Sequence, residues 1–121
     1  MPLRILVVDD SVVTRSLIQE FAECFGHKVV AEAATLPDAV AAFKEHKPDL
    51  VTLDLSLADG DGLTVLKALR GLDPKARVLV VSGNVQQAVH DEVQGAGAAG
   101  FLSKPFTLDE LGRALTRFSQ G

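Results

Sequence analysis

The feature that most constrains the fold of this chain is a regular alternation of short apolar runs with longer amphipathic segments. Several of the five runs are rich in Val, Ile and Leu at consecutive positions rather than at every second one. Continuous runs of this kind suit strands buried on both faces, whereas a strand with one wet face alternates polar and apolar residues. The expected strands are Arg4–Val8, Val29–Glu32, Leu50–Leu53, Arg77–Val81 and Gly100–Ser103.

The segments that follow these strands carry apolar residues at helical spacing. In the first segment Val13, Leu17, Phe21 and Phe25 fall four residues apart, which predicts a helix with one apolar stripe. Gly26 comes next and is a favourable residue just beyond a helix end. We therefore expect the four side chains to face the core together.

The other four helices are predicted in the same way, with clearer signals at some of their ends. Thr35 is the expected N-cap of the second helix, and residues 107–110 read as a capping box for the last. Pro48 and Pro74 mark the exits of the second and third helices. The apolar stripes are Leu36, Val40 and Phe43 in the second helix, Leu63, Leu66 and Leu69 in the third, Val85, Val89 and Val93 in the fourth, and Leu108, Leu111, Leu115 and Phe118 in the fifth.

Strict alternation of strand and helix indicates an α/β fold with one parallel sheet covered by helices on both faces. The connections between strands are expected to be right-handed. A chain of 121 residues with 47% hydrophobic residues suits a single domain spanning residues 1–121. No apolar run approaches the roughly 20 residues of a membrane span, and no signal peptide is visible. We therefore expect no membrane insertion and a cytoplasmic location.

Charge and cysteine content argue against other classes of protein. The net charge is −4 and the Lys and Arg residues are scattered, which disfavours nucleic-acid binding by this chain alone. Cys24 is the single cysteine, so an internal disulfide is excluded. Its neighbours Glu23 and Phe25 offer no cation to activate a thiol, and we interpret Cys24 as a small apolar filler in the first helix.

Polar side chains follow four of the expected strands at their carboxyl ends. They are Asp9 and Asp10 after the first strand, Asp54 after the third, Ser82 after the fourth and Lys104 after the fifth. In open α/β sheets, ligands bind in a crevice at this edge of the sheet. One acid alone would be interpreted as a turn former, and Asp10-Ser11 as a helix cap, but few structural roles explain the whole set.

The residue types at this edge suit a magnesium site beside a phosphate. Mg²⁺ prefers oxygen ligands and usually keeps several waters, so two or three carboxylates suffice for it. One of the carboxylates can also be a nucleophile, because aspartyl phosphates are known covalent intermediates. The metal and the lysine would then share the negative charge of the transferring phosphoryl group.

Short motifs surround each of these polar residues. They are Val7-Val8-Asp9-Asp10-Ser11, Leu53-Asp54-Leu55, Asp61-Gly62, Val81-Ser82-Gly83 and Phe101-Leu102-Ser103-Lys104-Pro105-Phe106. In sequence, order and separation they resemble the receiver domain of two-component response regulators, the CheY-like family, over essentially the whole chain. The resemblance implies a flavodoxin-like (βα)5 three-layer sandwich, with a five-stranded parallel sheet of strand order 2-1-3-4-5.

The resemblance also implies which residues bind the metal. Asp54 would be the phosphoacceptor and a metal ligand. Asp10 would bind Mg²⁺ directly, and Asp9 would act mostly through a coordinated water. The main-chain carbonyl of Ser56, two residues past the acceptor, would supply a further ligand.

Three further residues would contact the phosphoryl group or respond to it. Lys104 would pair with one phosphoryl oxygen, and Ser82 would donate its hydroxyl to another once Asp54 is modified. Phe101 stands where the family places its switch aromatic. The Lys104–Pro105 peptide bond would be cis, an expectation that rests on the family because X-Pro bonds are cis in only about 5–6% of cases.

Two positions depart from the pattern of the family. The loop after Asp54 commonly carries Met-Pro but here reads Leu57-Ala58, which we expect to be a tolerated variant that alters the backbone on the metal side. Phe101 replaces the common Tyr, so it can move by packing but has no hydroxyl to offer a partner. Ser56 and Asn84 flank the path of attacking water in the family and tune phosphoryl lifetime there, with an ordinary loop role as the alternative.

Three other patterns are not interpreted as sites. Residues 95–100 match G-x-G-x-x-G but end a helix and open a strand, the reverse of a dinucleotide fingerprint, so we expect a tight turn with positive φ. Residues 59–62 hint at a calcium loop, but its first and twelfth ligand positions would be Leu57 and Ala68. The histidines lie in unrelated segments, are expected to be solvated and are assigned no metal role: His27, His46 and His90.

The expected function is a phosphorylation switch rather than an enzyme that turns over a separate substrate. A sensor histidine kinase or phosphotransfer protein would donate a phosphoryl group from phosphohistidine to Asp54 with Mg²⁺ bound. The domain would catalyse only its own phosphorylation and dephosphorylation. The added charge would remodel the surface of the fourth helix, fifth strand and fifth helix for a downstream effector or output domain, with a phosphorylation-dependent dimer as one outcome.

Three rival functions stay open at this stage. A pseudo-receiver would bind proteins without ever turning over phosphate. A flavodoxin-like FMN carrier would need a hydroxyl- and glycine-rich loop where Asp9-Asp10 stand. A phosphatase with an Asp nucleophile would usually carry Asp-x-Asp after the first strand. The sequence also leaves open the cognate kinase, and whether the chain is a stand-alone receiver or the N-terminal domain of a longer protein.

Overall fold

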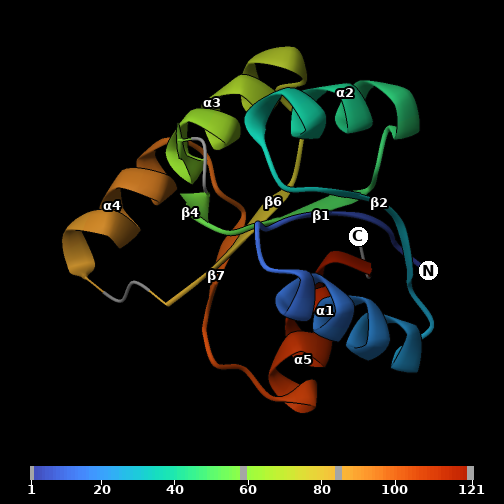
Figure 1. The fold of residues 1–121 in the computed structure, drawn as a ribbon. Coiled ribbons are helices and arrows are strands. Elements are labelled where there is room, and N and C mark those ends of the chain that lie inside the picture. The colour runs from blue at the N-terminus through green and yellow to red at the C-terminus, as the bar shows by residue number, and fades with distance from the viewer. Residues whose placement is uncertain (1, 58–59, 84–85, 120–121) are drawn as a thin grey trace.

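The computed structural model describes residues 2–57, 60–83 and 86–119, and it has the expected three-layer architecture (Figure 1). A five-stranded parallel sheet lies in the middle, in the order β2-β1-β3-β6-β7. Counted along the chain without the short ribbon described below, this is the expected order 2-1-3-4-5. The strands are β1 (Arg4–Val8), β2 (Lys28–Ala33), β3 (Leu50–Leu53), β6 (Val78–Ser82) and β7 (Gly100–Ser103).

Helices cover both faces of the sheet. One face carries α1 (Val12–Cys24) and α5 (Leu108–Ser119). The other face carries α2 (Leu36–His46), α3 (Gly62–Leu72) and α4 (Gln87–Gly95). None of the helices in the described part of the chain is long and apolar enough to cross a membrane.

Two hydrophobic clusters, one on each face, explain why the strands are apolar at consecutive positions. Along β1, Ile5 and Val7 point into the cluster beneath α1 and α5, whereas Leu6 and Val8 point into the cluster beneath α2, α3 and α4. All four side chains are at most 1% exposed. Successive residues of a strand face opposite sides, so burial on both faces requires an unbroken apolar run.

The ends of several elements follow the signals in the sequence. The Thr35 hydroxyl accepts a hydrogen bond from Asp38 N at 3.2 Å and caps α2. Thr107 and Glu110 exchange hydrogen bonds between side chain and main chain, which confirms the capping box before α5. Gly26 and Gly97 have φ of 82° and 96°, and Gly97 supplies the tight turn from α4 into β7.

The expected buried stripe of α1 was wrong at both ends. Val13 is 77% exposed and Phe25 is 41% exposed, while Ile18 and Ala22 are the buried residues of this helix. Each residue advances by about 100° around an α-helix, so positions twelve apart differ by about 120°. A strict four-residue repeat therefore rotates off the core face over three steps.

The solvent exposure expected for Cys24 and for the histidines also needs correction. Cys24 is exposed rather than a filler, because it lies in the last turn of α1 beyond the buried Ala22. His27 is only 7% exposed rather than solvated; its Nδ1 accepts a hydrogen bond from Leu3 N at 3.0 Å. Burial lowers the pKa of His27 and so favours the neutral imidazole, whose role here is structural.

A short antiparallel ribbon after β3 was not expected from the sequence. It pairs β4 (Ser56–Leu57) with β5 (Gly60–Asp61), directly before α3. Leu57 of the unusual Leu57-Ala58 pair lies in this ribbon, whereas Ala58 and Asp59 lie outside the described residues.

Candidate functional site

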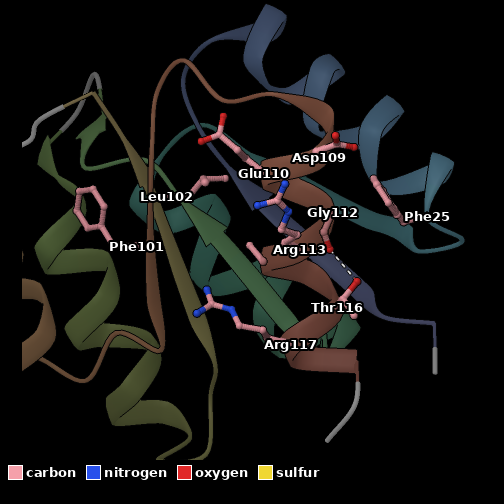
Figure 2. Close-up of a pocket in the computed structure, with 10 residues that line it drawn as sticks. Phe25, Phe101, Leu102, Asp109, Glu110, Gly112, Arg113, Thr116 and Arg117 are labelled. Atoms are coloured by element: carbon pink, nitrogen blue, oxygen red, sulfur yellow. Dashed lines mark hydrogen bonds between the residues drawn. The ribbon is translucent and has the colours of Figure 1, made fainter.

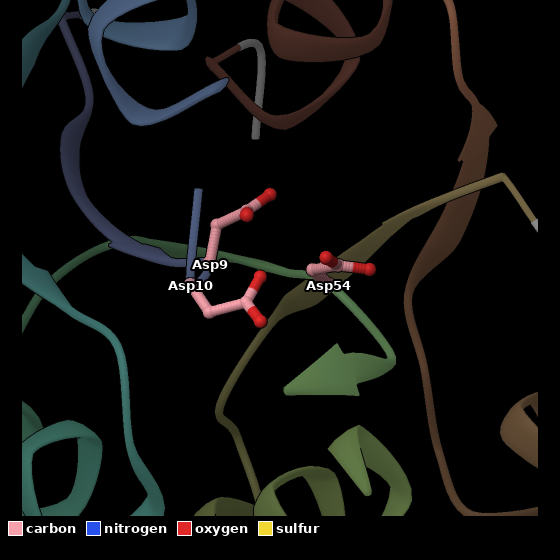
Figure 3. A group of neighbouring side chains, drawn as sticks. All are labelled: Asp9, Asp10 and Asp54. Atoms are coloured by element: carbon pink, nitrogen blue, oxygen red, sulfur yellow. The ribbon is translucent and has the colours of Figure 1, made fainter. Parts of the chain in front are cut away.

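Three acids meet at the carboxyl edge of the sheet, where two neighbouring strands end. Asp9 and Asp10 follow β1, and Asp54 follows β3, which pairs with β1. One carboxylate oxygen from each acid lies within 4.8 Å of the others (Figure 3). Asp9 and Asp54 are 1% and 6% exposed, whereas Asp10 is exposed.

Main-chain hydrogen bonds hold the two buried acids in place. Ser11 N donates to Asp9 Oδ1 at 2.8 Å, and Ser56 N donates to Asp54 Oδ1 at 3.1 Å. The main chain of Asp54 is fixed in turn, because its N–H donates to Val8 O at 2.9 Å. One oxygen of each buried carboxylate is thus satisfied by its own loop, and the second faces the centre of the site.

Lys104 joins the two buried acids from the end of β7. Its Nζ donates to Asp9 Oδ2 at 2.9 Å and to Asp54 Oδ2 at 3.2 Å. Its main-chain N–H donates to Ser82 O at 3.0 Å, which ties it to the end of β6. The Lys104–Pro105 peptide bond is cis, as the resemblance implied.

Burial and charge perturb the pKa values of Asp54 and Lys104. Burial raises the pKa of Asp54, and the negative charge of Asp9 adds to this; the Ser56 N–H and Lys104 act in the opposite direction but are outweighed. Burial acts to lower the pKa of Lys104, but the hydrogen bond to Asp9 and the charges of both acids outweigh it and raise that pKa. The lysine is therefore firmly protonated, and Asp54 carries a charge in an unfavourable environment.

The donor set of this cluster fits a divalent cation that prefers oxygen ligands. Three carboxylates and one ammonium leave two negative charges at the site, which a divalent cation would neutralise. Carboxylate oxygens are the ligands that Mg²⁺ selects, and it tolerates a site with few protein ligands. Asp9, Asp10 and Asp54 can therefore hold a metal ion together.

Ser82 and Phe101 occupy neighbouring strands beside this cluster. Ser82 ends β6, is 1% exposed and lies opposite Ser103 of β7. Phe101 lies in β7, opposite Val80, and is partly buried. Its ring stacks on the ring of His90 from α4, with centroids 3.7 Å apart and an angle of 28°. His90 is half-buried and packs against Phe101.

Two residues that contact the acid-bearing loops escaped the sequence analysis. Gly62 opens α3 so close to Asp54 that an added Cβ would lie 2.5 Å from the Asp54 carbonyl oxygen. Arg15 of α1 donates a hydrogen bond to the main-chain carbonyl of Asp9. The Asp61-Gly62 motif was a signal for Gly62. In contrast, nothing in a single sequence indicates that Arg15 binds the main-chain carbonyl of Asp9, six residues earlier.

A large open cavity lies elsewhere on the molecule, and Asp9, Asp10 and Asp54 are not among the residues that line it (Figure 2). Its volume is about 870 Å³, and it lies between β7 and α5 beside the end of α1. Its lining includes Phe25, Phe101, Leu102, Arg113 and Arg117. This cavity is therefore separate from the acidic cluster and lies on the surface of β7 and α5.

Comparisons with known proteins agree with this geometry. The family model of the response regulator receiver domain matches residues 5–116. The chemotaxis protein CheY of Bacillus subtilis is 39% identical over 117 residues, covering 97% of this chain and 98% of that protein. CheY of Thermotoga maritima is 35% identical over 120 residues and is covered completely.

Solved structures show the same fold. The crystal structure of the CheX-CheY-BeF3-Mg+2 complex from Borrelia burgdorferi matches 98% of this chain and 90% of that one, with a TM-score of 0.91 and 30% identity. The receiver domain of the putative response regulator NarL from Mycobacterium tuberculosis matches 99% of this chain and 98% of that one, with the same TM-score and 31% identity.

Proposed function

The chain belongs to the response regulator receiver domain family of two-component signalling, and on this premise we propose that it is a phosphorylation switch whose acceptor is Asp54. One observation carries the proposal. The buried Asp54 carboxylate lies beside two further acids, and its Oδ2 accepts a hydrogen bond from the ammonium of Lys104. An acid held in this way has a cation beside it to receive a phosphoryl oxygen and carboxylates to bind a metal.

The proposed reaction transfers a phosphoryl group from a phosphohistidine to Asp54. An Asp54 carboxylate oxygen attacks phosphorus, the P–N bond to the donor histidine breaks, and the imidazole leaves with its electron pair and takes a proton. Lys104 exchanges its contact with Asp54 for a phosphoryl oxygen and so stabilises the developing charge. Bound Mg²⁺ supplies further neutralisation of the phosphoryl oxygens.

The metal ligands in this proposal are the three acids and one main-chain carbonyl. Asp9, Asp10 and Asp54 would hold the ion, Asp9 mostly through a water molecule. The family resemblance would add the main-chain carbonyl of Ser56 as a further ligand. The similar CheY of Borrelia burgdorferi was solved with BeF3 and Mg+2, which supports the same cofactor for this chain.

The response to phosphorylation runs through Ser82 and Phe101. The new phosphoryl group draws the Ser82 hydroxyl toward it, and the space that Ser82 leaves admits the Phe101 ring. Because Phe101 packs on His90, a change in its position alters the contact between β7 and α4. The α4, β7 and α5 surface is then the part that a downstream effector or output domain reads, and a sensor kinase or phosphotransfer protein is the donor.

Mass spectrometry of the intact protein tests the proposal. Incubation with acetyl phosphate and Mg²⁺ should add the mass of one phosphoryl group, and Asp54→Asn should abolish the addition. Asp109→Asn, at an exposed acid of α5, is the matched control and should still be labelled. Labelling of Asp54→Asn at the unsubstituted level would exclude Asp54 as the acceptor.

A second measurement separates the switch from the pseudo-receiver. Beryllofluoride with Mg²⁺ should shift the NMR amide resonances of residues around Asp54 and of Phe101 in β7. A spectrum that Mg²⁺ and beryllofluoride leave unchanged would favour a module that binds proteins without phosphorylation.

A further inference from the structure

Arg15 lies near the start of α1 and contacts two other segments with one guanidinium group. Its Nη1 donates to the main-chain carbonyl of Asp9 at 2.6 Å, and its Nε donates to Glu32 Oε1 at 3.0 Å. The Arg15 side chain is 17% exposed and that of Glu32 is 41% exposed. The planar fork of arginine suits such a double contact, which joins the loop after β1 to β2.

The carbonyl that Arg15 binds belongs to the peptide bond between two candidate metal ligands. A peptide bond is planar, so its orientation fixes the direction in which the next residue, Asp10, leaves the main chain. The Asp9 N–H is held as well, because it donates to Ala33 O at 3.0 Å. The main chain of Asp9 is therefore anchored to β2 on one side and to Arg15 on the other.

Asp10 depends on this anchoring more than its two partners do. Its side chain is exposed, and within residues 2–57, 60–83 and 86–119 its carboxylate has no hydrogen bond or ion pair. Asp9 and Asp54, in contrast, each accept hydrogen bonds from a main-chain N–H and from Lys104. The place of the Asp10 carboxylate relative to Asp54 is thus set by the main chain that carries it.

We propose that Arg15 is a positioning residue for the acidic cluster. By holding the Asp9 carbonyl it keeps the Asp10 carboxylate where Asp10 and Asp54 can bind one Mg²⁺ ion, and Glu32 keeps the guanidinium in place. The inference rests on the proposed function and adds a residue to it that touches neither the metal nor the phosphoryl group. Removing groups that orient metal ligands typically weakens metal binding by about 10–100-fold.

The sign of the effect separates positioning from simple electrostatics. Arg15 carries a positive charge next to a cation site, so its removal would strengthen Mg²⁺ binding if charge alone mattered. Positioning predicts the opposite, because the Asp10 carboxylate would lose its fixed direction. Arg15→Met keeps most of the stem and removes the donors, and it should weaken Mg²⁺ binding about tenfold.

Arg70 offers a matched control near the start of β6, away from the carboxyl ends of the strands where the acids lie. Its Nη1 also donates to main-chain carbonyls, those of Pro74 and Ala76, at the end of α3 before β6 begins. Arg70→Met therefore removes comparable hydrogen bonds without touching the loop after β1. It should lower the free energy of unfolding and leave the Mg²⁺ affinity within about twofold of the unsubstituted protein.

Isothermal titration calorimetry with Mg²⁺ alone, together with urea unfolding followed by circular dichroism, tests the proposal. Arg15→Met should lose affinity about tenfold, Arg15→Lys should recover part of it, and Glu32→Gln, which retains an acceptor oxygen, should lose about two- to threefold. Unchanged or tighter Mg²⁺ binding by Arg15→Met would overturn the proposal. So would an equal loss of affinity in Arg70→Met, because it would show a general effect of stability.

Failure of this inference can be told apart from failure of the proposed function. If acetyl phosphate labels Asp54 but Arg15→Met binds Mg²⁺ as tightly as the unsubstituted protein, only the role of Arg15 is wrong. If Mg²⁺ binding weakens in Arg15→Met while Asp54 is never labelled, the acidic cluster is a metal site that Arg15 positions, and the phosphoacceptor assignment is wrong.

Discussion

Replacing Asp54, the proposed phosphoacceptor, should make the protein more stable. Asp54→Asn removes a negative charge from a side chain that is 8% exposed and keeps an oxygen that can accept the hydrogen bond from Ser56 N. Because burial raises the pKa of Asp54, the ionised carboxylate is unfavourable in the folded state at neutral pH. Loss of function and gain of stability should therefore accompany the same substitution.

The distances indicate how large the gain should be. At an effective dielectric constant of about 20, the contact of 3.2 Å with Lys104 is worth about 5 kcal/mol of attraction. The buried acid within 4.8 Å, Asp9, contributes about 3.5 kcal/mol of repulsion, and the exposed Asp10, screened by water, about 1 kcal/mol. The attraction and the repulsion nearly cancel, so the desolvation of the Asp54 carboxylate decides whether the substitution raises or lowers the stability. We expect Asp54→Asn to raise the free energy of unfolding by about 1–2 kcal/mol at pH 7.

Urea unfolding followed by circular dichroism in EDTA measures this gain, since the chain has no Trp or Tyr for fluorescence. Because the pKa of Asp54 is raised, this side chain keeps its proton to a higher pH in the folded state than in the unfolded state. Ionisation of Asp54 therefore destabilises the folded state, and this loss of stability grows as the pH rises from the ordinary pKa of 3.8 through the folded-state pKa. The gain from Asp54→Asn should be largest at pH 7 and shrink toward pH 4. Asp109→Asn should change stability by less than about 0.5 kcal/mol. An Asp54→Asn protein that is no more stable at pH 7, or equally stabilised at pH 4, would refute the reasoning.

Three other substitutions test separate parts of the structure. Lys104→Met should lower the free energy of unfolding, measured with urea in EDTA, by about 1–3 kcal/mol. Added Mg²⁺ should then stabilise this variant more than it stabilises the unsubstituted chain, because the ion replaces the lost cation. Gly62→Ala should lower the free energy of unfolding by about 2–3 kcal/mol, because the added Cβ would clash with the Asp54 carbonyl. Gly71→Ala lies in the same helix with open space around it and should raise the free energy of unfolding by about 0.5–1 kcal/mol. Thermal unfolding compares the two variants. Thr52→Val should raise the free energy of urea unfolding by about 1 kcal/mol, since the buried Thr52 hydroxyl has no partner among the described residues, and a loss instead would mean that the hydroxyl is satisfied.

The parallel sheet was accessible from the sequence because burial on both faces leaves a pattern that little else produces, whereas its strand order was implied by the resemblance to the receiver family. Leu50–Leu53 is apolar or small at every position, and all four residues prove to be buried. The face of α1 was not accessible in the same way. Val13 and Phe25 look equivalent to Leu17 in spacing, and only the packing of α1 against the sheet selects Ile18 and Ala22 as the buried residues.

The acids and the lysine of the site were predictable because each ends a strand, and parallel strands end at one edge. The parts that hold them were not. Gly62 acts through the absence of a side chain next to the Asp54 carbonyl, and Arg15 acts on a main-chain carbonyl. Contacts to main chain leave no complementary residue in the sequence, so they become visible only in three dimensions.

The ion pairs of Lys104 have a consequence for the protein during its synthesis and folding. The lysine reaches Asp9 across 95 positions of sequence and Asp54 across 50, from the strand at the edge of the sheet. A ribosome must therefore finish β7 before the two acids meet their cation. A chain released early, or one whose edge strand has come loose, presents clustered carboxylates without an ammonium. The complete cluster of acids and lysine therefore forms only in a chain that has been synthesised and folded through β7 and Lys104.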